Sequence, residues 1–178
     1  VGNRSADATG DGDDNTVFDT TNPVAGTALS PTWVSTSPIA VDYSNASDGG
    51  SGLKKVELWY KKGTGGSWTN SSQSSTEPSG SFNFSPTGAD TYYFDLVAED
   101  NAGNRSAAAT GDGDDSTVYD TSPPTTVAVT DTGLWTGTDQ SLSASWTASS
   151  DPQSGIEEYH YAIGTEAGLA DVVPWTPN

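Results

Sequence analysis

The sequence has no cysteine, a single histidine and only six basic residues in 178. Without cysteine, no disulfide framework supports the fold and no thiol chemistry is available. Zinc sites are built mainly from cysteine and histidine, so this composition excludes them too. The six basic residues stand against 24 acidic ones, which gives a net charge of −18. A chain with this charge repels nucleic acid and anionic membrane surfaces and attracts cations.

Hydrophobic residues are also scarce, at 32% of the chain, and no apolar run is long enough to span a membrane. We therefore expect no membrane insertion in this piece. Such polarity is typical of disordered chains. However, six Trp, seven Tyr and four Phe lie in runs that alternate with polar residues. This pattern instead predicts thin cores formed by short strands.

The clearest positive feature of the sequence is an internal repeat. Residues 2–5 (Gly-Asn-Arg-Ser) recur as residues 103–106, and Asp19 recurs as Asp120, each at an offset of 101 residues. A repeat of that length is one domain, so the chain is expected to come from an array of tandem domains.

Junctions that contain proline divide this array, because proline removes a backbone donor and restricts the residue before it. They predict three parts: residues 1–21, with a short strand at 16–20, close a preceding domain; residues 22–122 form a complete domain; residues 123–178 form the first half of another. The last part lacks the later strands of a sandwich. Either sequence outside this piece or a strand from a neighbouring copy completes it.

Between the junctions the pattern is all-β. Further strands are expected at residues 38–44, 53–61, 81–84, 91–99 and 116–121. Their period of two, the Gly, Pro, Asn and Ser turns between them and the lack of an amphipathic helix pattern predict a sandwich of about seven strands. Tyr92, at the start of the penultimate strand, is either a tyrosine-corner residue or an ordinary half-buried tyrosine.

Four motifs carry a family resemblance. They are Asp48-x-x-Ser51-Gly52-Leu53, Val56-Glu57-Leu58-Trp59-Tyr60, residues 98–104 (Ala-Glu-Asp-Asn-Ala-Gly-Asn) and Tyr119-Asp120-Thr121-x-Pro123. On these motifs the chain resembles the immunoglobulin-like and fibronectin type III-like repeats of large bacterial and archaeal extracellular proteins. The third part, with Trp146 and residues 154–164, looks more like fibronectin type III.

The resemblance implies tandem β-sandwiches at the cell surface or outside the cell. It implies a non-enzymatic structural role in adhesion or assembly, as a stalk, an adhesin spacer or a filament subunit. The implied partners are neighbouring immunoglobulin-like domains or identical subunits. Fold alone does not decide function, and such modules also serve as accessory domains of secreted carbohydrate-active enzymes. That role, with a cell-surface or glycan ligand, is the alternative.

Calcium is the expected ion, because it takes six to eight oxygen ligands and acidic loops supply them. In an immunoglobulin-like sandwich, the loop after the second strand and the loop before the last strand lie at the same pole. The residues of these loops that are candidate ligands are Asp48, Asp100, Asn101, Asn104, Asp112, Asp114 and Asp115. The spacing is not that of an EF-hand, since Gly113 falls too early. The other interpretation is that these side chains only shape turns.

Catalysis finds little support in the sequence. The one histidine, His160, is expected to face outward from a strand, and no nucleophile has a base at hand. We therefore expect no enzyme activity. Arg4 and Arg105 occupy the same repeat position, and each is expected to clamp loop carboxylates or carbonyls.

Tryptophans are the residues that favour a glycan ligand. Those whose rings are candidates to stack on sugars are Trp33, Trp59, Trp68, Trp135 and Trp175. The alternative is that they pack in cores or between domains.

Overall fold

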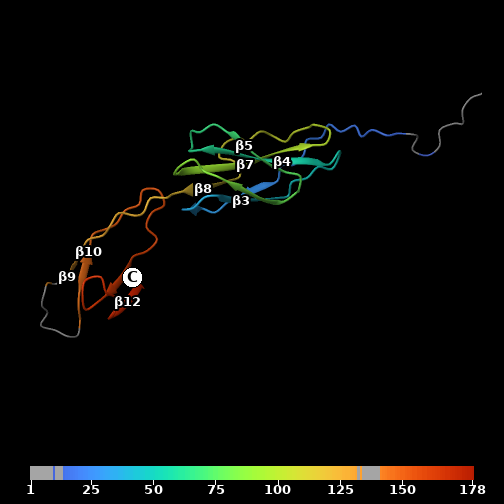
Figure 1. Ribbon diagram of the computed structural model, residues 1–178. Helices are drawn as coiled ribbons and strands as arrows, with labels where there is room; N and C mark the ends of the chain where they lie inside the picture. The colour runs from blue at the N-terminus through green and yellow to red at the C-terminus, as the bar shows by residue number, and fades with distance from the viewer. Residues whose placement is uncertain (1–9, 11–13, 132, 134–140) are drawn as a thin grey trace, which may run out of the picture. The chain divides into compact units, whose positions relative to one another are not determined.

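The computed structural model describes residues 10, 14–131, 133 and 141–178, and it is all-β (Figure 1). Within that part of the chain there is no helix long and apolar enough to cross a membrane. The chain divides into two compact units, Val1–Tyr119 and Asp120–Asn178. Residues Arg4 and Trp135, singled out above, lie outside the described residues.

The described residues of the first unit form two sheets with a shared core. The smaller sheet has the order β1-β3-β6 and the larger one β2-β8-β7-β4-β5. The strands are β1 (Thr27–Leu29), β2 (Trp33–Val34), β3 (Ile39–Ser44), β4 (Leu53–Lys62), β5 (Thr69–Ser75), β6 (Gly80–Phe84), β7 (Asp90–Asp100) and β8 (Asp115–Tyr119). β2 and β8 pair in parallel, and the other pairs are antiparallel.

The five strands expected between residues 38 and 121 are present as β3, β4, β6, β7 and β8. Alternation identified them because their inward side chains fill the core. β5 was missed because its sequence is Thr-Asn-Ser-Ser-Gln-Ser-Ser, which has no apolar residue to alternate. It is the edge strand beside β4, so backbone pairing rather than core packing holds it in place.

Alternating side chains of both sheets meet in the core. Residues Tyr92, Phe94, Leu96 and Ala98 point inward from β7 and are at most 2% exposed. Phe84 of β6 packs against the rings of Tyr92 and Phe94, with both centroid distances 5.3 Å. Each fully buried large side chain contributes about 1.5–3 kcal/mol. Burial of this face therefore specifies the register of β7, because a slip by one residue would expose it.

The Gln73 side chain joins β5, at one edge of the larger sheet, to β6, at one edge of the smaller sheet. Gln73 of β5 donates from Nε2 to the carbonyl of Asn83 in β6 at 3.0 Å. Its Oε1 accepts from the Asn83 backbone amide at 3.2 Å. The amide of Gln73 thus pairs with β6 as a strand residue would.

Tyr92 has a structural role beyond filling the core. Its hydroxyl donates to the Gly88 carbonyl at 2.9 Å and accepts from the Thr87 backbone amide at 2.9 Å. The partner carbonyl lies four residues upstream, as in a tyrosine corner. The hydroxyl fixes the entry of the chain into β7.

We predict that Tyr92→Phe lowers the free energy of unfolding by about 1–3 kcal/mol, because it removes two hydrogen bonds, each worth about 0.5–1.5 kcal/mol. Urea unfolding followed by tryptophan fluorescence measures this. The matched control is Tyr43→Phe, since the Tyr43 hydroxyl makes one longer bond, 3.3 Å to the Glu77 carbonyl. An equal loss in both variants would contradict the role given to Tyr92.

The second unit contains β9 (Val129–Asp131), β10 (Ala144–Trp146), β11 (His160–Ile163) and β12 (Val173–Pro177). β9 pairs with β10, and β11 pairs with β12, both antiparallel. The buried hydrophobic side chains of the described chain all belong to the first unit.

Residues 14–21 form no strand. Val17 and Phe18 are 65% and 91% exposed. The same positions one repeat later, Val118 and Tyr119, lie in β8 between β7 and β2. The strand predicted at residues 16–20 is therefore absent. A strand needs neighbouring strands to pair with, and in the first unit β8 already pairs with both β7 and β2.

Candidate metal centre

The loop between β3 and β4 is built around Asp48. Its Oδ2 accepts hydrogen bonds from the backbone amides of Gly50 (3.1 Å) and Gly52 (2.7 Å). Gly52 has φ +87°, a conformation that glycine adopts without strain. This is the Asx-turn chemistry that was the alternative to metal binding. Only one of the two carboxylate oxygens takes part in it.

The loop after β7 is built around Asp100, which is fully buried. Its Oδ1 accepts from the Asn104 backbone amide and its Oδ2 from Asn104 Nδ2, both at 2.8 Å. Gly103, with φ +94°, lets the chain turn between them. Asn104 therefore holds the Asp100 carboxylate in a fixed orientation.

Asp19 reaches these two loops from the segment that precedes β1. Its Oδ2 accepts from the Ser51 backbone amide at 2.6 Å, and its own carbonyl accepts from Asn104 Nδ2 at 3.1 Å. Hydrogen bonds from the backbone amides of Thr21 and Ser51 hold the pKa of Asp19 below its usual value. This carboxylate is therefore ionised at neutral pH.

One oxygen from each of Asp19, Asp48 and Asp100 lies within 4.8 Å of the others. Two ligands of one calcium ion are separated by at most about 5 Å, because each Ca–O distance is about 2.3–2.6 Å. Ionised carboxylates at this separation repel one another. Oδ1 of Asp48 is buried and accepts no hydrogen bond. The donor set and this unpaired oxygen fit a hard divalent cation.

The other predicted ligands lie elsewhere or act differently. Asn101 Nδ2 donates to the carbonyls of Ser51 and Gly52 at 3.0 and 3.1 Å, which ties the two loops together. Asp114 and Asp115 accept from the backbone amides of Ala28 (2.9 Å) and Ser30 (2.6 Å), respectively.

Distance along β7 explains this separation. Asp115 pairs with Phe94, six positions before Asp100 in β7. At about 3.3 Å per residue, this is roughly 20 Å. The loop before the last strand therefore begins beside the cluster of Asp19, Asp48 and Asp100 but ends far from it.

Asp112 accepts a hydrogen bond from Lys61, whose Nζ lies 2.9 Å from its Oδ1. Lys61 is 4% exposed, and its ammonium group lies 4.5 Å from the centroid of the Tyr93 ring and 5.6 Å from that of Trp68. A buried ammonium needs such partners. Here Asp112 anchors its loop to the sheet rather than facing the carboxylate group.

The three carboxylates were not fully predicted, because Asp19 was not among the candidate ligands. The sequence did contain a signal for it, namely its recurrence as Asp120. In the second unit, Ser154 donates its hydroxyl to Asp120 Oδ2 at 2.9 Å and its backbone amide to Asp151 Oδ1 at 3.1 Å. Asp151 matches Asp48 in the repeat. In each unit, the aspartate that precedes the first strand is therefore hydrogen-bonded to the equivalent loop.

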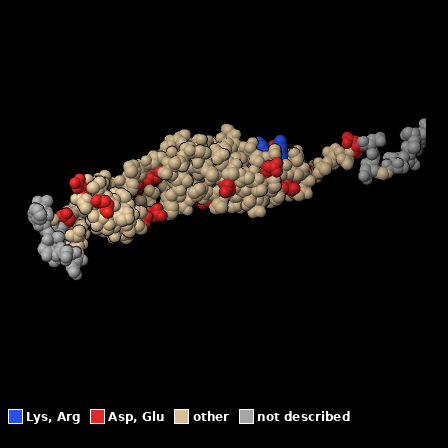
Figure 2. All heavy atoms as spheres, turned by 60° about the horizontal axis from the view of Figure 1, so that its bottom comes forward, with Lys and Arg blue, Asp and Glu red and all other residues tan. Residues whose placement is uncertain are grey.

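Arg105 acts as a clamp, but between strands. Its Nη2 donates to Glu57 at 2.6 Å and its Nη1 to Glu99 at 2.9 Å. Lys54 and Lys55 also pair with Glu99, at 2.6 and 3.3 Å. In the view of Figure 2, basic side chains gather at one place on the first unit while acidic ones are spread widely.

The described residues that were candidates for catalysis or glycan stacking, His160 and four of the tryptophans, are placed as follows. His160 is exposed and lies 2.6 Å from Glu158. Trp59 is half-buried and donates to Glu57, and Trp68 packs near Lys61. Trp33 and Trp175 are 61% and 70% exposed, but they belong to different units.

Comparison with protein-family models, with curated proteins and with solved structures yields no match for this chain. The interpretation of the site therefore depends on its own geometry and on the internal repeat.

We predict that Gly50→Ala disrupts the cluster of Asp19, Asp48 and Asp100, because a Cβ at residue 50 would collide with the Asp19 carboxylate. The matched control is Gly49→Ala, since a Cβ at Gly49 meets no atom within 4 Å. Chemical shifts of the Ser51 amide, which donates to Asp19, report the change. A Ser51 shift that is the same in both variants would contradict this geometry.

We also predict that Glu99 makes stability depend on pH. Hydrogen bonds from Lys54 and Lys55 lower its pKa from 4.5 to about 2. Its contribution is complete above about pH 4.5 and is lost as the pH falls toward about 2. Urea unfolding across this range should show a shallower acid loss in Glu99→Gln than in the wild type. Glu77→Gln, at an exposed loop position, should retain the wild-type slope.

Proposed function

We propose that the chain is a non-enzymatic structural module of an extracellular array, in which calcium fixes the segment that precedes each domain. The array serves as a stalk, an adhesin spacer or a filament. The observation that carries this proposal is the recurrence of one arrangement: Asp19 on the Asp48–Ser51 loop, and Asp120 on the Asp151–Ser154 loop. A contact made by both repeats is part of how such repeats are joined, because its residues recur with the domain period.

The strand arrangement supports an immunoglobulin-like assignment of the first unit. The order β8-β7-β4 in the larger sheet corresponds to the neighbouring last, penultimate and third strands of that fold. The hydroxyl bonds of Tyr92 to the residues before β7 are a second feature of such domains. The two strand pairs of the second unit correspond to the first strands of the same fold.

Asp19, Asp48 and Asp100 would hold the ion, and Asn104 positions two of them by bonding the Asp100 carboxylate and the Asp19 carbonyl. A bound cation offsets the repulsion among three carboxylates and gives Asp48 Oδ1 a partner. It also links three segments that are distant in sequence. Calcium would then hold the segment around Asp19 more firmly than the bonds from Ser51 and Asn104 alone. This suits a load-bearing array outside the cell, where calcium is abundant.

We predict that 10 mM calcium raises the melting temperature of the first unit relative to chelator. Extracellular calcium modules have dissociation constants of about 10⁻⁴–10⁻³ M, so this concentration stabilises by about 1–3 kcal/mol. The expected shift is several degrees. Differential scanning calorimetry measures it, and an identical melting temperature in both conditions would overturn the proposal.

Matched variants locate the ion. Asp48→Asn and Asp100→Asn should each abolish the calcium-dependent shift, whatever they do to the basal melting temperature. Asp112→Asn should retain the shift, because Asp112 pairs with Lys61 instead. If Asp112→Asn alone abolished the shift, the ion would belong to a different loop.

A further inference from the structure

Side-chain bonds close the first unit at both sides of its two sheets. Gln73 and Asn83 join β5 to β6 at one side. At the other side lie β1, the opposite edge of the smaller sheet, and β8 with β2, the opposite edge of the larger sheet. Among the described strands β1 pairs with β3 alone, so the backbone amides on its second edge need other partners.

Two carboxylates of the loop before β8 supply these partners. Asp114 Oδ2 accepts from the Ala28 amide at 2.9 Å, and Asp115 Oδ2 accepts from the Ser30 amide at 2.6 Å. The two amides are two residues apart, so they point to the same edge of the strand. Hydrogen bonds to an ionised acceptor are stronger than those between neutral groups. The amide of Asp114 in turn donates to the Phe94 carbonyl at 2.8 Å, which fixes the loop on β7.

These bonds continue directly into a parallel strand pair. The Val118 amide donates to the Thr32 carbonyl at 2.9 Å, and β2 then pairs in parallel with β8. Residues 28–34 are thus bonded to residues 114–119 by two carboxylates and by the backbone. We call this contact the β1–β8 seam.

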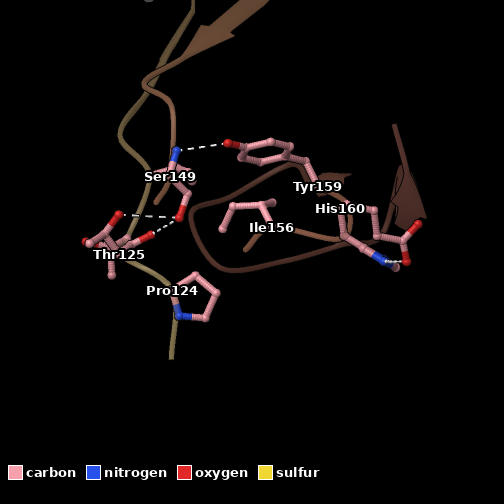
Figure 3. Close-up of a pocket in the computed structure, with 9 residues that line it drawn as sticks. Pro124, Thr125, Ser149, Ile156, Tyr159 and His160 are labelled. Atoms are coloured by element: carbon pink, nitrogen blue, oxygen red, sulfur yellow. Dashed lines mark hydrogen bonds and ion pairs between the residues drawn. The ribbon is translucent and has the colours of Figure 1, made fainter. Parts of the chain in front are cut away.

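Each unit also holds the segment through which the chain enters it. In the first unit, Val24 and Ser47 exchange two backbone hydrogen bonds, at 2.8 and 3.0 Å. In the second unit, the Thr125 amide donates to the Ser150 carbonyl at 3.0 Å. Figure 3 shows the neighbouring Ser149, whose hydroxyl also donates to the Thr125 carbonyl. In the first unit, a pull on the entering chain therefore passes from this attachment to β1 and β2.

The chain enters and leaves the first unit at opposite ends of β7. It enters beside Asp100, where the Asp19 carbonyl accepts from Asn104, and it leaves after Tyr119, which pairs with Asp90. The 11 residues of β7 separate these ends by roughly 35 Å, at about 3.3 Å per residue. A pull on both ends of the unit therefore acts along the strands. Because β2 and β8 are parallel, this pull slides them past each other and loads all bonds of the seam together.

We propose that Asp114 and Asp115 lock the β1–β8 seam under tension, so that the acidic loop gives the first unit its resistance to unfolding by force. The importance of this resistance rests on the proposed function, because an array that links or projects something is pulled at the ends of its domains. The proposal gives a role to two aspartates whose carboxylates lie far from the cluster of Asp19, Asp48 and Asp100.

The test applies a constant force to single molecules of the whole chain in the presence of chelator. The sequence has no cysteine, so Asn22→Cys and Ser122→Cys provide two unique attachment points. Replacing Asp114 and Asp115 together by alanine should shorten the lifetime of the first unit under force by at least about tenfold, because two charge-assisted bonds are lost. Gln73→Ala, which removes the bonds at the other side of the sheets, should change it by less than about twofold.

A second pair of attachment points separates mechanical from general stabilisation. With Thr76→Cys, in the loop between β5 and β6, in place of Asn22→Cys, the force no longer passes through residues 22–34. The alanine replacements should then change the lifetime by less than about twofold. If the alanine form does not fold, Asp114→Asn with Asp115→Asn keeps an acceptor without the charge. It should shorten the lifetime by about threefold with the first pair of attachment points alone.

Two results would overturn the proposal. One is an equal shortening with both pairs of attachment points, which would show that the aspartates stabilise the fold without a special role under tension. The other is a shortening by Gln73→Ala as large as that by the aspartate replacements. Because the force measurements are made in chelator, either result would leave the calcium melting experiment unaffected. Conversely, an unchanged melting temperature in calcium would refute the calcium site and leave the seam as a separate finding.

Discussion

The pairing of β4 with β7 is the interaction on which the first unit depends. It runs from Leu53 and Asp100 at one end to Lys62 and Tyr92 at the other. One face of this pair supplies Val56, Leu58, Tyr92, Phe94 and Leu96 to the core. The other face carries the charged network and the buried Lys61. Its one end brings the Asp48 loop beside the Asp100 loop. The core, the loop anchored by Asp112 and the cluster of Asp19, Asp48 and Asp100 therefore all depend on the register of β4 and β7. A slip of this register would disturb all three.

Much of this fold follows from the sequence because an apolar side chain recurs at every second position on the inward faces of β3, β4 and β7. The strands that alternation missed, such as β5, are held by backbone pairing at an edge, which leaves no mark on side-chain type. The strand predicted at residues 16–20 was wrong for the opposite reason, because its side chains suggest a strand that does not form. It has the side chains of β8, but strand formation also needs flanking strands, and local sequence does not say whether they are free.

The candidate site was predictable in part for a related reason. Asp48 and Asp100 end or follow strands that the pattern located, so their meeting at one pole could be expected. Asp19 comes from a segment without secondary structure, and only the repeat pointed to it. Asp112, Asp114 and Asp115 were misplaced because composition identifies an acidic loop but not its path. That path is set by Lys61 and by the amides of β1 and the residue after it, partners that no local pattern reveals.

The bond between Gln73 and Asn83 has a consequence for folding in an array. Tandem domains of similar sequence are held at high local concentration, where an open strand of one domain can pair with its neighbour and misfold. Gln73 uses the backbone N–H and C=O of Asn83 in β6 without adding a strand, and the serine-rich β5 offers nothing apolar to a wrong partner. In the proposed array, the first unit would thus keep its β5 and β6 edges unattractive to neighbouring copies.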